Sequence, residues 1–555
     1  MKSPRLPETR GTLLVLLSIS GFALVIASPF GNQIEWLSPS VLFGLYGTLP
    51  LTYWLGIGVM TLSLLLGLRN GDIKVFAAQF LLIYIALWSA PALFERYPSV
   101  WDSYMHYFST INIMESGSSL TEGMFSYSAN YPGFFVLTAV YSLLGNPPVL
   151  EMLRFYPIVA SLFTFIALYL TVRTYVPALG LRTALVLSAL GNVWVQYSFS
   201  PQSLGLAIAL LIFVFLERGG TKWLLMAIAA FTFLAISHPT SMFIVAGALI
   251  IRELVVRFRA LRSRDGAGER PWPVSIFLII WAIWLITGAR MYSWFLGSLV
   301  YQKLLYIFYL PSAVEQTAFM RTAGNIFPVS SLLRTALLGI FFLLFALAIV
   351  MLLWGRRKDR SARKRMRVSA ISLVLVPLVL APLDIFFLQG SIYDRALLFF
   401  ALAAPLFFVP TLVAERKRIF KVLLFAAAVM AAVCICTSMY QESLYVVSDR
   451  SLATSDFLAD VMPPSSSVIG GTYPHLVWRD GERGSFAQAE LWSVFPIPFG
   501  NLTRDSGATG MVFDRTSELW HLQWGTINLY NFYSSQIGNH SKVFDNGAYV
   551  MIYGA

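Results

Sequence analysis

Asp102 and His106 are the residues of this chain whose types and spacing best suit chemistry. They stand four positions apart in WDSYMHY, so a helix would bring both to one face. They directly follow an apolar segment, at a point where a chain leaving a bilayer can present polar groups. A carboxylate there can take or orient a proton, and an imidazole can be its partner or a metal ligand. We predict both as catalytic; the alternatives are a helix N-cap for Asp102 and an ordinary interfacial histidine for His106.

The composition indicates which class of protein carries this pair. Of 555 residues, 57% are hydrophobic and 12% are charged, which is more apolar surface than a soluble core can bury. The formal charge of +12 comes from short basic runs between apolar segments, a pattern typical of cytoplasmic anchoring and not of nucleic-acid binding. Cys434 and Cys436 would point to different faces of a helix and cannot pair with each other. The chain is therefore predicted to be an integral membrane protein.

The membrane part consists of apolar segments that are long enough, or nearly so, to cross about 30 Å of hydrocarbon. A further apolar piece, from Gly133 to Leu144, is short and is flanked by prolines. If it lies in the interface instead of crossing, every basic cluster falls on the cytoplasmic side, as the positive-inside rule favours. The predicted spans are 11–28, 46–68, 73–91, 154–172, 182–198, 202–217, 222–237, 239–256, 272–289, 331–354, 368–388, 395–413 and 419–439.

This topology predicts an all-α polytopic fold of about 13 transmembrane helices with a small C-terminal extracytoplasmic α/β domain. The N-terminus lies in the cytoplasm, and the first apolar segment is interpreted as a retained anchor. The predicted parts are two helices in 1–72, a core of 73–439 with outer loops 92–153 and 290–330, and a tail of 440–555. All five histidines fall in segments assigned to the outer face: His106, His238, His475, His521 and His540.

Several motifs follow one another in a characteristic order. An acid stands shortly after an early membrane segment, and a loop ending in YPG leads into the interfacial GFFVLTAVYSLLG. An arginine then opens the span MLRFYPIVASLFTFIALYLTVR, and SFSPQSLGL and YDRALLFFALAAPLF follow. This order, over about residues 73 to 415, resembles the GT-C class of membrane glycosyltransferases, which includes oligosaccharyltransferase catalytic subunits, protein O-mannosyltransferases and aminoarabinose transferases. The chain departs from the class in having two extra apolar segments at its N-terminal end.

The resemblance implies an inverting transfer of a sugar from a polyprenyl-phosphate-linked donor to an acceptor, at the outer face of the cell membrane. Asp102 would be the general base or the carboxylate that orients the acceptor. The acceptor is a glycan, a lipid or a protein, and no nucleic acid takes part. The sequence requires no cofactor, and a divalent metal held by Asp102 and His106 stays open.

A departing polyprenyl phosphate needs cationic donors, and aromatic faces can stack on a sugar. Arg395 is the first candidate, because it opens a span at the outer face, where arginine is disfavoured. Its alternative role is a salt bridge to Asp394 or Asp384. The other substrate-binding candidates are Tyr131 of the YPG stretch, Arg154, His238, Arg290 and Arg321. The alternative for Arg154 is a side chain that only reaches toward the membrane surface, and for His238 a residue that only joins two helices. The alternative for the aromatic loop of Arg290 and Arg321 is an interfacial amphipathic helix.

Two other classes of protein have the same size and apolarity. A transporter or flippase for lipid-linked saccharides should show a pseudo-repeat or helices interrupted near the midplane, and the sequence has neither. A membrane receptor or scaffold would explain the tail but gives the Asp102 loop no purpose. The transferase interpretation requires Asp102, His106 and at least one outer arginine to come together.

Overall fold

The computed structural model describes most of the helical part of the chain and short stretches of the tail. The described residues are 8–28, 43–68, 72–95, 97–98, 100, 102–119, 127–191, 197–262, 272–294, 297–298, 300–301, 328–354, 368–387, 393–415, 417–438, 447–461, 467–470, 487–490, 510–514, 541–545 and 549–553.

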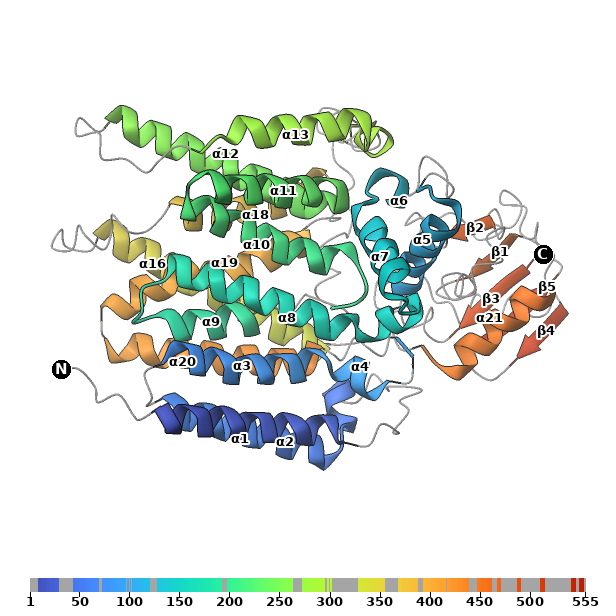
Figure 1. Cartoon of the computed structure of the whole chain (residues 1–555), viewed down its shortest axis with the longest axis horizontal. Coiled ribbons are helices and arrows are strands. Elements are labelled where there is room, and N and C mark those ends of the chain that lie inside the picture. The colour runs from blue at the N-terminus through green and yellow to red at the C-terminus, as the bar shows by residue number, and fades with distance from the viewer. Residues whose placement is uncertain are drawn as a thin grey trace.

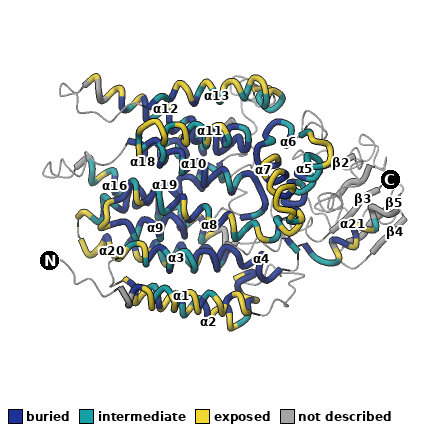
Figure 2. Tube along the Cα trace, in the orientation of Figure 1, coloured by how far each residue is buried: buried dark blue, intermediate teal, exposed yellow. Residues whose placement is uncertain are grey.

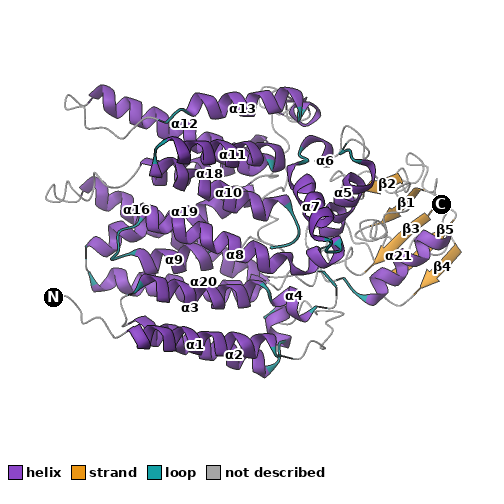
Figure 3. Ribbon diagram, in the orientation of Figure 1, coloured by secondary structure: helices purple, strands orange, loops and turns teal. Residues whose placement is uncertain are grey.

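Long helices lie side by side in a bundle, and a small sheet lies beyond one end of it (Figures 1 and 3). Between that end and the sheet lie α5, α6 and α7 (Figure 1). In chain order the helices are α1 (Glu8–Ile26), η1 (Gly44–Thr48), α2 (Leu51–Gly67), α3 (Ile73–Trp88), α4 (Ala90–Phe94), α5 (Asp102–Ser116), α6 (Tyr127–Asn130), α7 (Gly133–Gly145), α8 (Val149–Tyr175), α9 (Leu181–Leu190), α10 (Pro201–Arg218), α11 (Thr221–Ser237), α12 (Pro239–Arg262), α13 (Val274–Thr287), α16 (Pro328–Trp354), α18 (Val368–Phe387), α19 (Tyr393–Ala414) and α20 (Arg418–Ser438).

A helix occurs at each apolar segment for which a span was predicted, but several bounds differ. The helix predicted to reach residue 91 ends at Trp88, because Pro91 interrupts its hydrogen bonding. α8 begins at Val149 instead of at 154, and α9 ends at Leu190 instead of at 198. α12 continues to Arg262, beyond the predicted end of its span at 256.

The helices have the length and composition of membrane helices. Of those described, five contain a segment long and apolar enough to cross a membrane, in α8, α10, α16, α19 and α20. Further apolar helices are shorter, at 10–17 residues, and include α2, α3, α7 and α11. The chain therefore has the helices of a multi-pass membrane protein, and the number of crossings stays a prediction.

α19 forms the centre of the bundle. Phe400, Ala404 and Phe408 on this helix are fully buried, and it packs against α9, α16 and α18. The helices at the rim instead expose apolar side chains, among them Leu65 on α2 and Phe425 on α20 (Figure 2). An exposed apolar surface of this extent suits contact with lipid.

The two ends of the bundle carry different residues. The final turns of α8, α10, α12 and α19 and the first turns of α9, α11 and α20 lie at the end remote from α5–α7 (Figure 1). At this end Arg182 Nη1 donates to the carbonyl of Leu68 at 2.7 Å, and the Arg218 guanidinium lies 4.4 Å from the centre of the Trp223 ring. Basic residues of these turns are Arg173, Arg182, Arg218, Lys222, Arg257, Arg418 and Lys421. The predicted basic clusters within the described helices therefore lie at one bundle end.

A buried polar network joins three helices at this basic end. Arg252 of α12 donates through Nε to Ser369 Oγ of α18 at 3.3 Å, and Ser369 donates to Glu217 Oε1 of α10 at 2.5 Å. The Arg252 guanidinium also lies 3.5 Å from the centre of the Trp272 ring. Glu253 accepts the backbone N–H of Trp272 at 3.1 Å. Because charged side chains in an apolar interior need such partners, the network fixes α10, α12 and α18 relative to one another.

The tail forms helix α21 (Asp449–Val461) and a five-stranded sheet (Figure 1). The sheet order is β2-β1-β3-β5-β4, with β1 parallel to β2 and β3, and β5 antiparallel to β3 and β4. Val447 and Leu452 pack in one apolar cluster with Tyr104 of α5, so α21 rests on the layer that covers the bundle end. The strands are β1 (Ser467–Gly470), β2 (Ala487–Glu490), β3 (Gly510–Asp514), β4 (Ser541–Asp545) and β5 (Tyr549–Tyr553).

α1 and α2 cross closely at a pair of glycines. A Cβ added at Gly56 would lie 2.5 Å from the Gly21 carbonyl oxygen, and one added at Gly21 would lie 2.8 Å from the Gly56 oxygen. Small residues at such a crossing let two membrane helices pack backbone against backbone. Two residues further along α2, a Cβ at Gly58 would meet nothing within 4 Å.

Gly56→Ala should therefore destabilise the hairpin of α1 and α2, because a backbone oxygen cannot move aside for the new methyl group. We expect a loss of about 1 to 3 kcal/mol in unfolding free energy, measured by thermal unfolding in detergent. Gly58→Ala is the matched control and should leave stability unchanged or slightly raised. Equal stability of the two variants would contradict the close crossing.

Candidate functional site

The loop that leads to Asp102 has a strained backbone. Val100 has φ of 71° and is buried, although a β-branched residue rarely adopts this left-handed conformation. α5 begins at Asp102, so this residue stands at the helix N-terminus, as both the catalytic and the capping interpretations require. The side chain of Asp102 lies outside the described part of the structure. Strain of this kind persists only where the surroundings fix the conformation, and it is common at functional sites.

His106 follows one turn later on α5, about 6 Å along the helix axis. It is buried, and its ring lies 5.5 Å from the ring of Phe135 on α7 and 6.2 Å from that of Tyr127 on α6. α5 and α7 are also joined by a hydrogen bond between Thr110 and Thr138, at 3.1 Å between their hydroxyl oxygens. These contacts fix His106 in the layer between the bundle end and the tail.

The stretch around YPG packs on the end of α11. Tyr127 donates through its hydroxyl to the carbonyl of Ser237 at 3.2 Å. A side chain at Gly133 would collide with Ser237, so only glycine allows α7 to approach this closely. Tyr131 is buried, and its ring meets that of Tyr292 edge-on at 5.2 Å. The residues of this stretch therefore lie next to the turn that contains His238.

His238 is both the end of α11 and the cap of α12. Its Nδ1 accepts the backbone N–H of Ser241 at 3.2 Å and lies 2.9 Å from the Ser241 hydroxyl. Because Nδ1 accepts, the neutral ring carries its proton on Nε2. Burial holds the pKa of His238 well below 6.5, and electrostatic interactions with Arg395 and with His106 lower the pKa further. His238 is therefore a neutral hydrogen-bond donor near two other cationic or protonatable groups.

Arg395 lies in the first turn of α19, half-buried. Its Nε donates to Gln202 Oε1 of α10 at 3.1 Å. Asp384, one of its predicted partners, is buried and accepts the backbone N–H of Tyr393 at 2.5 Å, so it caps α19. The side chain of Asp394, the other predicted partner, lies outside the described part. Arg395 is thus held in place by an amide oxygen from the first turn of α10, in the stretch SFSPQSLGL.

The tyrosines beside Arg395 stay protonated. Burial raises the pKa of Tyr131, and the neighbouring Tyr292 and Tyr127 raise it further. The pKa of Tyr292 is also raised, mainly by burial. The charge of Arg395 acts in the opposite direction, and that of Asp384 adds to the increase. A neutral hydroxyl donates a hydrogen bond, whereas a phenolate cannot. The group therefore combines one fixed guanidinium with neutral donors and aromatic faces, an arrangement that can receive a phosphate bearing a sugar.

The structure brings together some of the predicted site residues and leaves others apart. His106, His238, Arg395 and Tyr131 lie in one region, linked through the contacts above, and Asp102 begins the helix that carries His106. Arg290 is exposed, two residues before Tyr292. Arg321 lies outside the described residues.

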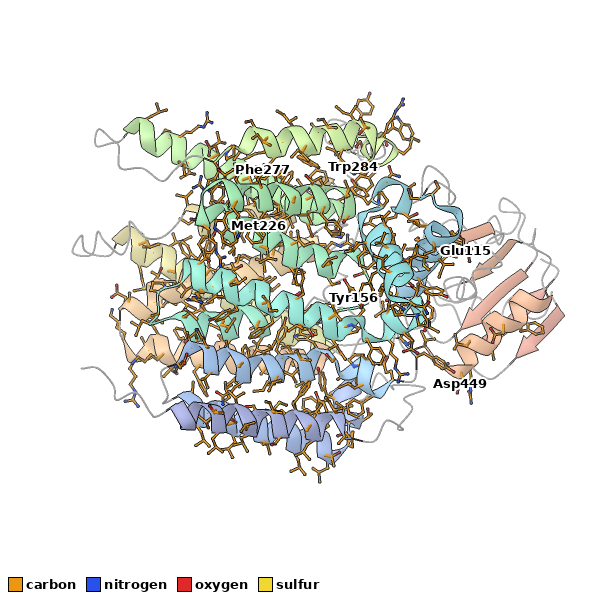
Figure 4. All side chains as sticks on the ribbon, in the orientation of Figure 1. Glu115, Tyr156, Met226, Phe277, Trp284 and Asp449 are labelled. Atoms are coloured by element: carbon orange, nitrogen blue, oxygen red, sulfur yellow. The ribbon has the colours of Figure 1, made fainter. Side chains whose placement is uncertain are left out.

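Arg154 stands apart from this group, on α8. Its guanidinium lies 5.9 Å from the centre of the Phe155 ring, and its Nε is buried without a hydrogen-bond partner among the described residues. The neighbouring Tyr156 donates to the carbonyl of Ser200 at 3.2 Å, which ties α8 to the turn before α10; Figure 4 labels this tyrosine beside α5–α7. Within the described part of the chain, the contact of the Arg154 guanidinium is with its neighbour Phe155 on α8.

A metal site would need at least three suitable side chains close together. Among the side chains that the structure describes, no three His, Cys, Asp or Glu residues form such a group. The side chain of Asp102 is not among them. A site held by Asp102 and His106 therefore has no third described ligand.

Sequence reasoning missed four members of the region: Tyr127, Asn130, Gln202 and Tyr292. Asn130 Oδ1 accepts the backbone N–H of Tyr292 at 3.2 Å, over a separation of 162 residues. Gln202 meets Arg395 over a separation of 193 residues. Contacts of this range leave no local pattern in a sequence. Only the nearness of Tyr127 and Asn130 to YPG, and of Tyr292 to Arg290, could have pointed to them.

Comparison with known proteins gives one kind of similarity. No protein-family model matches the chain, and no curated protein matches it. Among solved structures it is similar to the crystal structure of ArnT from Cupriavidus metallidurans bound to undecaprenyl phosphate. The two chains are 11% identical, with a TM-score of 0.46, over 87% of this chain and 98% of that one. The likeness is one of fold alone, and at this TM-score it carries no argument about the chemistry of this chain.

The low pKa of His238 predicts a pH dependence of stability. An unfolded histidine takes up a proton near pH 6.5, but the folded His238 does so only at lower pH, so between these values the unfolded state binds more protons. Stability should therefore fall as the pH drops below about 6.5. His238→Asn keeps a capping side chain and should remove this part of the decline. Thermal unfolding in detergent from pH 7.5 to 5 measures it; parallel declines in wild type and variant would contradict the prediction.

Proposed function

We propose that this protein is a membrane glycosyltransferase that moves a sugar from a polyprenyl-phosphate-linked donor to an acceptor at the bundle end that carries α5–α7. The observation that carries the proposal is that His238 lies close enough to Arg395 and to His106 for both to lower its pKa, while Tyr127 packs against the same turn and Tyr131 against Tyr292. His106 is on the helix that Asp102 begins. The resemblance of the motifs to the GT-C class supports the same reaction. By the positive-inside rule this end, opposite the basic one, faces the outside.

The proposed reaction is a displacement at the anomeric carbon. A hydroxyl or amide of the acceptor attacks this carbon, the bond from carbon to phosphate oxygen breaks, and the electron pair leaves with the polyprenyl phosphate. Asp102 takes the proton of the acceptor or orients it. Arg395 stabilises the negative charge that grows on the phosphate, and the Nε2–H of His238 and the tyrosine hydroxyls add neutral donors. The isoprenoid tail stays in the bilayer beside the apolar rim helices.

The alternative classes find less support in the described structure. A carrier of lipid-linked saccharides would place its polar residues near the middle of the bundle. Arg395 and His238 instead lie at helix termini, in the first turn of α19 and at the start of α12. A receptor or scaffold would not need protonated tyrosines and a neutral histidine around one guanidinium.

Asp102→Asn should abolish most of the transfer, because the amide cannot accept the proton of the acceptor. Membranes containing wild type or variant are incubated with radiolabelled polyprenyl-phosphate sugars, and label that reaches any acceptor is counted. We expect a loss of about 10²- to 10⁴-fold. Glu115→Gln is the matched control, since this carboxylate is exposed near the other end of α5 (Figure 4). Equal transfer by wild type and Asp102→Asn, or no consumption of donor by wild type, would refute the proposal.

Arg395→Gln should weaken the donor's contact with the protein, because a neutral amide replaces the charge that faces the phosphate. We expect KM for the donor to rise, or kcat/KM to fall, by about tenfold or more, with a partial effect in Arg395→Lys. Arg418→Gln removes an exposed arginine at the opposite bundle end and is the control. The measurement is the initial rate over a range of donor concentrations. A kcat/KM unaffected by Arg395→Gln would exclude its contact with the phosphate.

A further inference from the structure

The helix that leads out of the bundle toward Asp102 is broken. α3 ends at Trp88 and α4 begins at Ala90, with Pro91 in its first turn. Proline has no N–H, so the carbonyl of Leu87, four residues earlier, loses its helical donor. The interior of a bundle in lipid offers no water to replace it. A break at this point therefore needs donors from neighbouring side chains.

Two buried tyrosines supply these donors. Tyr46 donates through its hydroxyl to the carbonyl of Leu87 at 2.6 Å, and Tyr53 donates to that of Ala86 at 3.1 Å. Both side chains are fully buried. The ring of Tyr53 also meets the ring of Phe94 on α4 edge-on at 5.5 Å. The pair thus holds α3 before the break and α4 after it.

These tyrosines come from the N-terminal hairpin. Tyr46 lies on η1 and Tyr53 on α2, and both precede the segments on which the GT-C resemblance rests. The hairpin is itself fixed by the crossing of Gly21 and Gly56. The two apolar segments that the GT-C class lacks therefore contact α3 and α4, the helices that lead to Asp102.

The path from the break to Asp102 is short and is held at several points. α4 ends at Phe94 and α5 begins at Asp102. Within this path Glu95 is buried, Tyr97 donates through its hydroxyl to Asp449 Oδ1 of α21 at 2.5 Å, and Val100 adopts its left-handed conformation. The described residues of this path are held by these contacts, so we expect a change in the angle between α3 and α4 to reach the first turn of α5.

We propose that Tyr46 and Tyr53 are positioning residues, whose hydroxyls fix the break between α3 and α4 and thereby hold the first turn of α5, which begins at Asp102 and carries His106 one turn later. They act through the backbone and touch no substrate. The effect on transfer rests on the proposed function, whereas the effect on the position of residue 102 does not.

A spin label at residue 102 tests the positioning without any substrate. The full chain carries Cys434→Ala and Cys436→Ala, with Asp102→Cys labelled by a nitroxide. Tyr46→Phe and Tyr53→Phe together remove two hydroxyls and keep both rings. We expect the label at 102 to become more mobile, while a label at Leu225→Cys on the exposed face of α11 does not change. Tyr169→Phe, a half-buried tyrosine in the second half of α8, is the matched control and should change neither.

Unchanged mobility at 102 in the folded double variant, or an equal rise at both labelled positions, would overturn the inference. With Asp102 in place, the double variant should transfer sugar about tenfold or more slowly, with the donor KM unchanged. Normal turnover despite raised mobility at 102 would exclude a role in transfer. If wild type transfers no sugar at all, the proposed function fails, and the mobility measurement still decides the positioning.

Discussion

The constraint on which this structure depends is that backbone groups freed at helix ends within an apolar bundle must find partners in the protein. The candidate site is built from such ends, and side chains serve each of them. Tyr46 and Tyr53 donate to carbonyls at the end of α3, His238 accepts an N–H at the start of α12, and Asp384 accepts one at the start of α19. These capping side chains lie at the bundle end that carries α5–α7, where the proposed substrate headgroup would meet them.

A capping role and a functional role do not exclude each other in this arrangement. His238 uses Nδ1 for the backbone of α12, which fixes the ring and places its proton on Nε2. Asp384 uses Oδ2 for α19 and thereby sets the first turn in which Arg395 lies. The sequence presented a helix junction and a binding residue as alternatives for His238. The geometry supports both roles, because the capping bond at Nδ1 fixes the ring and so fixes the direction in which its Nε2–H can donate.

Hydropathy predicted where the helices lie, because each needs a long apolar run, and a helix was found at each predicted span. It did not predict the break of the helix at Pro91. The carbonyl groups exposed by this break accept hydrogen bonds from two tyrosines that lie 38 or more residues earlier in the chain. Nor did hydropathy show that Arg252 is buried within α12, since its contacts with Ser369 and Trp272 are made with segments further along the chain. Local motifs were enough to single out His106, Tyr131, His238 and Arg395 as candidates, and their role in a site stays a prediction. Gln202 and Tyr292 were missed because their contacts exist only once α10, α19 and the outer loop have come together.

The basic end of the bundle bears on which function is possible. Alternating access in a carrier requires each end to open in turn. At the basic end, however, Arg252 joins α12 to α18, and Ser369 passes the contact on to Glu217 of α10. Opening between these helices would separate the buried Arg252 from Ser369, and Ser369 from the half-buried Glu217, which is costly in an apolar interior. A substrate would then enter and leave from the α5–α7 end or from the side of the bilayer, as a lipid-linked donor with its headgroup at the interface does. The network at the basic end is thus an argument for transfer at one face of the membrane and against transport through the bundle.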